Sequence, residues 1–212
     1  MSPSAGTVFL VDDDPRVTVA LARLLRAADF EVRSFSSASE FLQEHDASVP
    51  GCAVLDIAMS GMNGIELQRR LVHTGCERPI VFLTGQGNIP MSVEAMKAGA
   101  VDFLTKPVSA ENLFTAIRLA LDKDQADRLA RAALADVEAR LATLTPRENE
   151  ILRLVIAGLL NKQIASELGT AEKTIKAHRG RVMRKMGVRS VADLTRATMR
   201  AGIAPARFPP NR

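Results

Sequence analysis

The sequence predicts a multi-domain protein, in which an α/β doubly wound domain with a five-stranded parallel sheet precedes an all-α domain of four helices. Three observations predict this organisation. Short strand-like runs alternate with helical patterns over the first 120 residues. The charge then reverses, because residues 1–120 hold 10 Lys and Arg against 14 Asp and Glu, whereas residues 144–212 hold 14 against 5. That basic part consists of short helical segments with clear caps.

The front domain is expected over residues 1–121 as a (βα)5 unit. Five short runs have the length of strands in a parallel sheet, namely Thr7–Val11, Glu31–Phe35, Cys52–Asp56, Ile80–Thr84 and Val101–Thr105. Helices are predicted to begin near Pro15, Ser39, Gly64, Pro90 and Ser109. Such sheets bind their ligands at the carboxyl ends of the strands, so the residues just after each strand are the first candidates for a site.

A helical linker is predicted over residues 122–143, because neither Gly nor Pro interrupts the chain from Ser109 to Thr145. Apolar residues recur in it at alternating spacings of four and three, at Ala130, Leu134, Val137, Leu141 and Leu144. This spacing fits a coiled-coil seam. It fits equally well a helix that packs against the second domain.

The back domain is expected over residues 144–204. Thr145-Pro146-Arg147-Glu148 predicts an N-cap with a capping box. The other predicted caps are Asn161, Thr170 and Ser190 at helix starts, and Gly169, Gly187 and Gly202 at helix ends. A short helix, Lys162–Leu168, and a longer one, Ala171–Met186, flank a turn with the spacing of a helix-turn-helix. Residues 205–212 hold too little apolar content to pack and are predicted to be disordered.

Composition excludes several classes of protein. No stretch approaches the ~18 consecutive apolar residues of a spanning helix. Residues 1–6 lack the basic and apolar segments of a signal peptide. We therefore expect a cytoplasmic protein without a membrane partner. The cysteines, Cys52 and Cys76, match neither a disulfide framework nor a metal-binding spacing, so buried free thiols are expected.

Residues with reactive side chains stand where four of the predicted strands end. They are Asp12, Asp13 and Asp14 after the first strand, Asp56 at the end of the third, Thr84 at the end of the fourth and Lys106 after the fifth. Singly, the run of three Asp residues fits a solvated loop, Thr84 fits an ordinary β-branched strand residue, and Lys106 fits a surface lysine. Together they meet at one rim, because parallel strands bring these ends side by side. Carboxylates gathered there would repel one another unless a cation held them, and their oxygen ligands suit Mg²⁺.

Asp56 lies at the centre of the predicted sheet and is the candidate nucleophile. A carboxylate accepts a phosphoryl group by in-line transfer when a metal and a cation neutralise the transferred oxygens. Mg²⁺ on Asp13 and Asp56, together with Lys106 and Thr84, would supply this. A Mg²⁺-dependent phosphatase is a competing class, but the acidic run here has Arg16 where that class has Thr or Val.

In order and in strand context, these residues resemble the motifs of a two-component receiver domain. The motifs are Val11-Asp12-Asp13, Asp56 followed by Met59 and Gly64, Leu83-Thr84-Gly85, and Lys106-Pro107, and the resemblance covers residues 7 to about 121. It implies that a histidine kinase phosphorylates Asp56. It also implies that Mg²⁺ is held by Asp13 and Asp56 directly, by Asp12 through water and by the carbonyl of Ala58.

The same resemblance assigns roles around the phosphoryl group. Thr84 and Lys106 contact that group, and Phe103 is the rotating aromatic of the switch. A cis peptide bond is implied between Lys106 and Pro107. Where the family commonly has Pro, this chain has Ser60, so we expect a looser loop with no ligand lost.

The longer helix of the predicted helix-turn-helix has an apolar face and a cationic face. A charged face is usually only solvated, but here Glu172 alone opposes the cations, which favours phosphate binding. The segments Leu144–Glu148, Asn161–Ala165, Thr174–His178 and Val182–Met186 resemble the LuxR-type DNA-binding domain over residues 142 to about 204. The whole chain is similar to FixJ-type response regulators.

Groove chemistry assigns roles to individual residues on this helix. Lys176 and Ala177 lie near its start and are predicted to read base edges. The phosphate candidates are Lys162, Lys173, Thr174, Arg179, Arg181 and Arg184. Gly180 either permits close approach to DNA or is a tolerated surface glycine. His178 is expected to pack or to touch a phosphate rather than to bind a metal.

The sequence thus predicts a phosphorylation-dependent DNA-binding transcriptional regulator, which is not an enzyme beyond mediating its own phosphoryl transfer and dephosphorylation. The predicted cofactor is Mg²⁺. The predicted partners are double-stranded DNA, a sensor histidine kinase, RNA polymerase and a second copy of the chain, which the resemblance places around Pro90 to Phe103 after phosphorylation. The alternative is an atypical response regulator that binds DNA constitutively, without phosphorylation.

Overall fold

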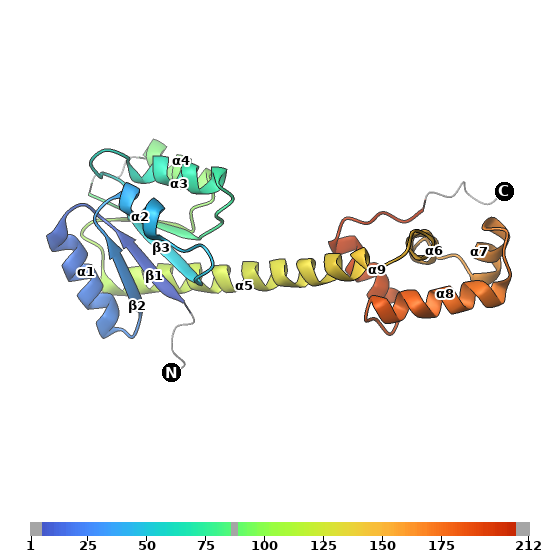
Figure 1. Cartoon of the computed structure of the whole chain (residues 1–212). Coiled ribbons are helices and arrows are strands. Elements are labelled where there is room, and N and C mark those ends of the chain that lie inside the picture. The colour runs from blue at the N-terminus through green and yellow to red at the C-terminus, as the bar shows by residue number, and fades with distance from the viewer. Residues whose placement is uncertain (1–5, 86–88, 207–212) are drawn as a thin grey trace. The chain divides into compact units, whose positions relative to one another are not determined.

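The structure is a computed structural model that describes residues 6–85 and 89–206 (Figure 1). The chain forms two compact units, residues 1–128 and 129–212. The elements, in order, are β1 (Thr7–Val11), α1 (Pro15–Ala27), β2 (Glu31–Phe35), α2 (Ala38–Glu44), β3 (Gly51–Asp56), α3 (Gly64–His73), β4 (Ile80–Thr84), α4 (Ile89–Lys97), β5 (Asp102–Thr105), α5 (Ala110–Ala142), α6 (Pro146–Ile156), α7 (Asn161–Glu167), α8 (Glu172–Lys185) and α9 (Val191–Arg200).

The first unit contains a five-stranded parallel sheet in the order β2-β1-β3-β4-β5, which confirms the doubly wound prediction. Two predicted strand bounds shift by one residue: β3 begins at Gly51 and β5 at Asp102. A Cβ on Gly51 would lie 1.9 Å from the carbonyl oxygen of Thr7, so a glycine is needed where β3 starts against β1.

Two apolar layers cover the two faces of the sheet. Because successive side chains of a strand point to opposite faces, Phe9 packs in one layer and Leu10 in the other. The layer around Phe9 includes residues of α2, α3 and α4, and the layer around Leu10 includes residues of α1 and of the first turns of α5. Covering both faces leaves the rim at the strand ends as the place for a polar site.

The second unit is all-helical around a core that α6, α7, α8 and α9 share. The last turns of α5 pack against this core through Val137 and Leu141, and Leu144 follows them. The spacing of these residues is therefore explained by packing within the second unit. Ala130, the first residue of the predicted seam, is exposed.

Two predicted helix starts are confirmed and two are wrong. Thr145 forms the capping box with Glu148, and Ser190 caps α9 through its side chain. Asn161 is the first residue of α7 rather than its cap, and the side chain of Gln163 accepts the N–H of Leu160 instead. Thr170 is also not a cap, because α8 starts after Ala171, which makes no side-chain capping bond.

The predicted disordered tail is wrong for Ala206. Its N–H donates to the carbonyl oxygen of Arg153 at 3.1 Å, and its side chain packs against the second core. The rest of the predicted tail, residues 207–212, lies outside the described residues.

Cys52 is buried, and burial raises the pKa of its thiol to about 12. Cys76 is only half-buried, against expectation. Within the described ranges, no helix has the length and apolar character needed to cross a membrane.

Candidate functional site

Three carboxylates and one lysine meet at the carboxyl ends of β1, β3 and β5. Asp12 and Asp13 follow β1, Asp56 is the last residue of β3, and one oxygen of each lies within 4.8 Å of the others. The Nζ atom of Lys106 lies 2.6 Å from Oδ2 of Asp12 and 2.8 Å from Oδ1 of Asp56. The structure therefore brings together four of the five charged residues that the strand-end rule selected.

The sheet register explains this meeting. Val11 of β1 pairs with Leu55 of β3, so the residues that follow them, Asp12 and Asp56, emerge side by side at the rim. The N–H of Lys106 donates to the carbonyl oxygen of Thr84 at 2.6 Å, and its peptide bond to Pro107 is cis, as the resemblance implied. Backbone pairing between neighbouring strands thus positions each side chain.

The charges at this rim do not balance. Burial would lower the pKa of Lys106, but hydrogen bonds and charges of Asp12 and Asp56 outweigh that effect and raise it. The ammonium therefore stays charged, yet it faces three carboxylates, of which Asp12 is 2% and Asp56 5% exposed. An oxygen-rich site with surplus negative charge fits a hard divalent cation such as Mg²⁺.

The loop after β3 is attached to this site through Ser60. Both its N–H and its hydroxyl donate to Oδ2 of Asp13, each at 2.7 Å. These bonds, the hydroxyl's first, hold the pKa of Asp13 below its ordinary value. The loop that we expected to be looser is thus tied to Asp13 by two hydrogen bonds.

Asp14, the third member of the acidic run, has a different role. Its side chain accepts the N–H of Arg16 at 2.9 Å and caps α1. It is not one of the three residues grouped at the rim. Sequence reasoning missed this cap, although an acidic residue directly before a proline-initiated helix is a recognisable signal.

Of the remaining predicted residues of this site, Thr84 and Ala58 lie at the same end of the sheet, and Phe103 lies within β5 opposite Phe82. Thr84 is buried at the end of β4, and Ala58 is exposed two positions after Asp56. Phe103 on β5 is half-buried, with its ring 6.4 Å from that of Phe82. Their roles in binding and switching stay predictions.

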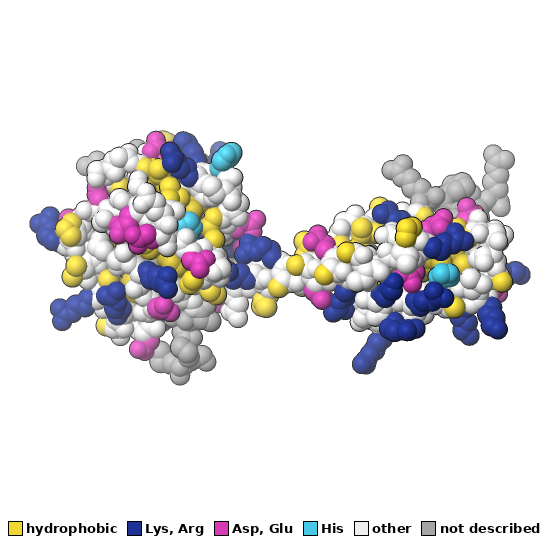
Figure 2. All heavy atoms as spheres, in the orientation of Figure 1, with side chains coloured by type: hydrophobic (Ala, Val, Ile, Leu, Met, Phe, Trp, Pro, Cys, Tyr) yellow, Lys and Arg dark blue, Asp and Glu magenta, His cyan; other side chains and the backbone are white. Residues whose placement is uncertain are grey.

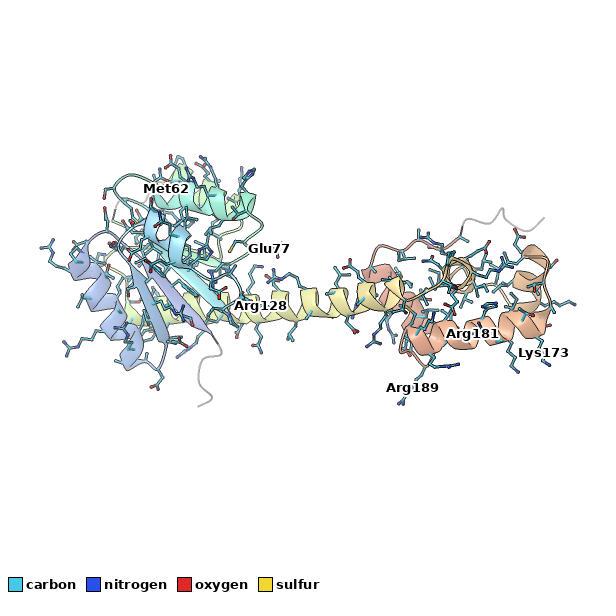
Figure 3. The ribbon with its side chains drawn as sticks, viewed as in Figure 1. Met62, Glu77, Arg128, Lys173, Arg181 and Arg189 are labelled. Carbon is cyan, nitrogen blue, oxygen red and sulfur yellow. The ribbon has the colours of Figure 1, made fainter. Side chains whose placement is uncertain are left out.

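A second candidate site is the cationic face of α8 in the second unit. Figure 2 shows Lys and Arg side chains gathered on the visible face over α8, and Figure 3 labels Lys173 and Arg181 on it. The predicted contact residues that are exposed are Lys162, Lys173, Thr174, Lys176, Ala177, Gly180, Arg181 and Arg184. Ile175 and Val182 lie buried on the opposite face, so the helix is amphipathic as predicted.

Arg179 and His178 differ from these exposed residues. Arg179 is half-buried, and its Nη1 donates to Oδ1 of Asn161 at 3.0 Å, which ties α8 to the start of α7. His178 is half-buried, and its Nδ1 is buried without a hydrogen-bond partner among the described residues. Helical spacing alone could not separate these two from the solvent-facing cations, because the crossing angle of the two helices decides the outcome.

Comparisons with known proteins assign each part of the chain to a domain family. Residues 8–118 match the response regulator receiver domain, and residues 142–198 match the bacterial regulatory proteins of the luxR family. Nodulation protein W of Bradyrhizobium diazoefficiens is 44% identical over 197 residues, which cover 93% of this chain and 87% of that protein. Transcriptional regulatory protein FixJ of the same organism is 40% identical over 198 residues, covering 93% and 97%.

Two solved structures of similar length resemble the chain. The response regulator StyR matches with a TM-score of 0.83 at 48% identity, covering 91% of this chain and 98% of that chain. Full-length FixJ from B. japonicum matches with a TM-score of 0.57 at 40% identity, covering 93% and 98%.

The acidic rim of a (βα)5 sheet and the basic helix-turn-helix define a response regulator, a non-enzymatic class of protein that joins a receiver to a DNA-binding domain. The chain belongs to the two-component response regulators with a LuxR-type DNA-binding domain, the family that includes FixJ. Receiver domains bind Mg²⁺ at an acidic pocket, which Asp12, Asp13 and Asp56 form here. This domain pair implies DNA and a histidine kinase as partners.

Proposed function

We propose that this chain is a DNA-binding transcriptional regulator whose activity depends on phosphorylation of Asp56 by a sensor histidine kinase. One observation carries the proposal: the Asp56 carboxylate is 5% exposed and lies within 4.8 Å of two further carboxylate ligands and 2.8 Å from Lys106. A buried carboxylate with a cation beside it and metal ligands around it has what in-line phosphoryl transfer requires.

This geometry supports the following transfer step. A carboxylate oxygen of Asp56 attacks phosphorus, the P–N bond of the kinase phosphohistidine breaks, and its electron pair returns to the imidazole. Asp13, Asp56 and the Ala58 carbonyl would hold Mg²⁺, with Asp12 acting through water, and the cation would supply neutralising charge. The ammonium of Lys106 turns to the new phosphoryl oxygens, and the Thr84 hydroxyl donates to them.

The added charge shifts the receiver between two conformations through Thr84 and Phe103. The shifted state dimerises through the face around Pro90 to Phe103, on α4 and β5. The two DNA-binding domains of the dimer then bind paired half-sites. Because they are linked, binding of the first raises the effective concentration of the second at its half-site, without any new base contact. A coupling of only about 1–3 kcal/mol is sufficient for such a switch.

On DNA, the second unit uses α8 as its recognition helix. Lys176 and Ala177 read base edges, and the exposed cations around them contact phosphates. Arg179 also positions α8 through its bond to Asn161. The bound dimer then acts on transcription through RNA polymerase.

The test is mass spectrometry of the full chain after incubation with Mg²⁺ and a small phosphodonor. We expect the wild type to gain the mass of one phosphoryl group and Asp56→Asn to gain none. Glu40→Gln, a carboxylate on α2 of the same unit, serves as a control that keeps the label. An unlabelled wild type would support the alternative, a regulator that binds DNA constitutively.

A further inference from the structure

Ser60 joins two loops that carry the acidic site. It lies in the segment between β3 and α3, and its two donors reach Asp13, 47 residues earlier in the chain. Both bonds end on one oxygen, Oδ2, at 2.7 Å each. A proline at this position would have neither an N–H nor a hydroxyl, so the tie depends on the serine that this chain carries.

Two donors on one carboxylate oxygen restrict the carboxylate to one orientation. A free Asp side chain that binds a cation loses rotamer freedom at that moment, whereas a carboxylate already held in place loses less. Oδ1 of Asp13 takes no hydrogen bond from Ser60, so this oxygen can bind a cation while both bonds to Oδ2 persist.

We infer that Ser60 is a positioning residue for the divalent cation: it holds Asp13 in the orientation that binds Mg²⁺ and thereby tightens cation binding. The inference rests on the proposed function, because it takes the acidic rim as the cation site. It adds a residue that touches neither the cation nor the phosphoryl group and acts only through Asp13.

Competition between Ser60 and the cation predicts the opposite change in Mg²⁺ affinity. If the donors of Ser60 occupied the position that the cation needs, removing them would tighten Mg²⁺ binding. The sign of the change in affinity therefore separates positioning from competition.

The experiment measures the Mg²⁺ dissociation constant of the full chain by calorimetry, without any phosphodonor. Ser60→Ala removes the hydroxyl donor, and Ser60→Pro removes both donors. We expect the dissociation constant to rise about threefold in the first variant and about tenfold in the second. Ser60→Thr keeps both donors and should have the wild-type dissociation constant. A merely structural role of this position would not require Mg²⁺ affinity to follow the number of donors.

Ser36 offers a matched control. Its N–H and hydroxyl also donate to one carboxylate oxygen, Oε2 of Glu40, each at 2.6 Å, but Glu40 is not part of the acidic rim. Ser36→Ala should therefore leave Mg²⁺ affinity unchanged. Thermal unfolding of every variant identifies any loss of affinity that comes from unfolding.

The outcomes separate the two proposals. Equal dissociation constants in the wild type, Ser60→Ala and Ser60→Pro would overturn the inference and leave the phosphoacceptor site intact. Tighter binding in the variants would overturn it in favour of competition. A wild type that binds no Mg²⁺ would overturn the cation site itself, and with it the chemistry of the proposed function.

Discussion

The Nζ atom of Lys106 lies 2.8 Å from Oδ1 of Asp56, and the same nitrogen lies 2.6 Å from Oδ2 of Asp12. One ammonium thus bridges two nearly buried carboxylates from different strands. The bridge offsets the repulsion between these carboxylates, and the same ammonium is available to a phosphoryl group on Asp56. Stability and phosphoryl chemistry therefore depend on one side chain.

Lys106→Ala should destabilise the receiver and make its stability more dependent on Mg²⁺. The change leaves two buried carboxylates without their cation, at a cost of about 2 kcal/mol. Because Mg²⁺ replaces the missing charge, it should stabilise this variant more than the wild type. Urea unfolding with chelator and with excess Mg²⁺ measures both effects. Lys123→Ala, which breaks an exposed ion pair with Asp127 on α5, is the control. Equal losses of unfolding free energy in the two variants would contradict this account.

Arg128 should stabilise the loop that leads into β3. It donates to the carbonyl oxygens of Ala47, Ser48 and Val49 at 2.9 to 3.0 Å and to Asp124 at 2.7 Å, beside the receiver sheet (Figure 3). Arg128→Ala should cost about 2 kcal/mol and raise hydrogen exchange in residues 47–51. Arg118→Ala, exposed on the same helix, should change neither. Unchanged protection of the loop would show that Arg128 does not hold it.

Glu148 should make the second unit sensitive to acid. Its carboxylate accepts from Nζ of Lys185 at 2.6 Å and from the N–H of Thr145 at 3.0 Å, and the first of these chiefly lowers its pKa to about 2. A pKa depressed in the folded state adds stability above the ordinary value of 4.5 and loses it as the pH falls towards about 2.

Glu148→Gln should therefore be less stable than the wild type at neutral pH, and the difference should shrink from pH 4.5 downwards. Urea unfolding across this range measures the difference. Glu150→Gln, which removes an exposed carboxylate paired with Arg147 on the same helix, is the control variant. A constant gap between wild type and Glu148→Gln would mean that ionisation of Glu148 does not contribute.

Gly180→Ala should stabilise the second unit and weaken its binding to DNA. A Cβ at Gly180 would meet no atom within 4 Å, so packing inside the unit does not require glycine. Alanine should therefore add about 1 kcal/mol of helix stability. If α8 approaches DNA closely at this point, the methyl group should lower affinity about tenfold, ~1.4 kcal/mol. Higher stability with unchanged affinity would identify a tolerated surface glycine.

The strands, the sheet class and the acidic rim were predictable from sequence because they follow from local patterns. The carboxyl ends of parallel strands lie side by side at one edge of the sheet, so the proximity of Asp12, Asp56 and Lys106 was predictable from their positions in the sequence. The capping box at Thr145 is equally local, since three residues separate its two partners.

Features that depend on tertiary geometry were not predictable in this way. The bonds from Ser60 to Asp13 and from Gly51 to Asp124 join residues 47 and 73 positions apart, and no spacing rule selects them. Arg179 shows the same limit, because its bond to Asn161 depends on how α7 and α8 cross. The apolar spacing through Val137 and Leu141 fitted both a coiled-coil seam and packing against the second domain. The core of the second unit shows that these residues pack there.

The central claim is that phosphorylation of Asp56 controls how the chain binds DNA. The most direct measurement is the affinity and stoichiometry of the full chain on its operator, first located by genomic footprinting, with and without a phosphodonor and Mg²⁺. We predict that phosphorylation raises affinity at least about fivefold and changes the complex to two chains per operator, and that Asp56→Asn does not respond. Equal affinity and stoichiometry in both states of the wild type would contradict the account.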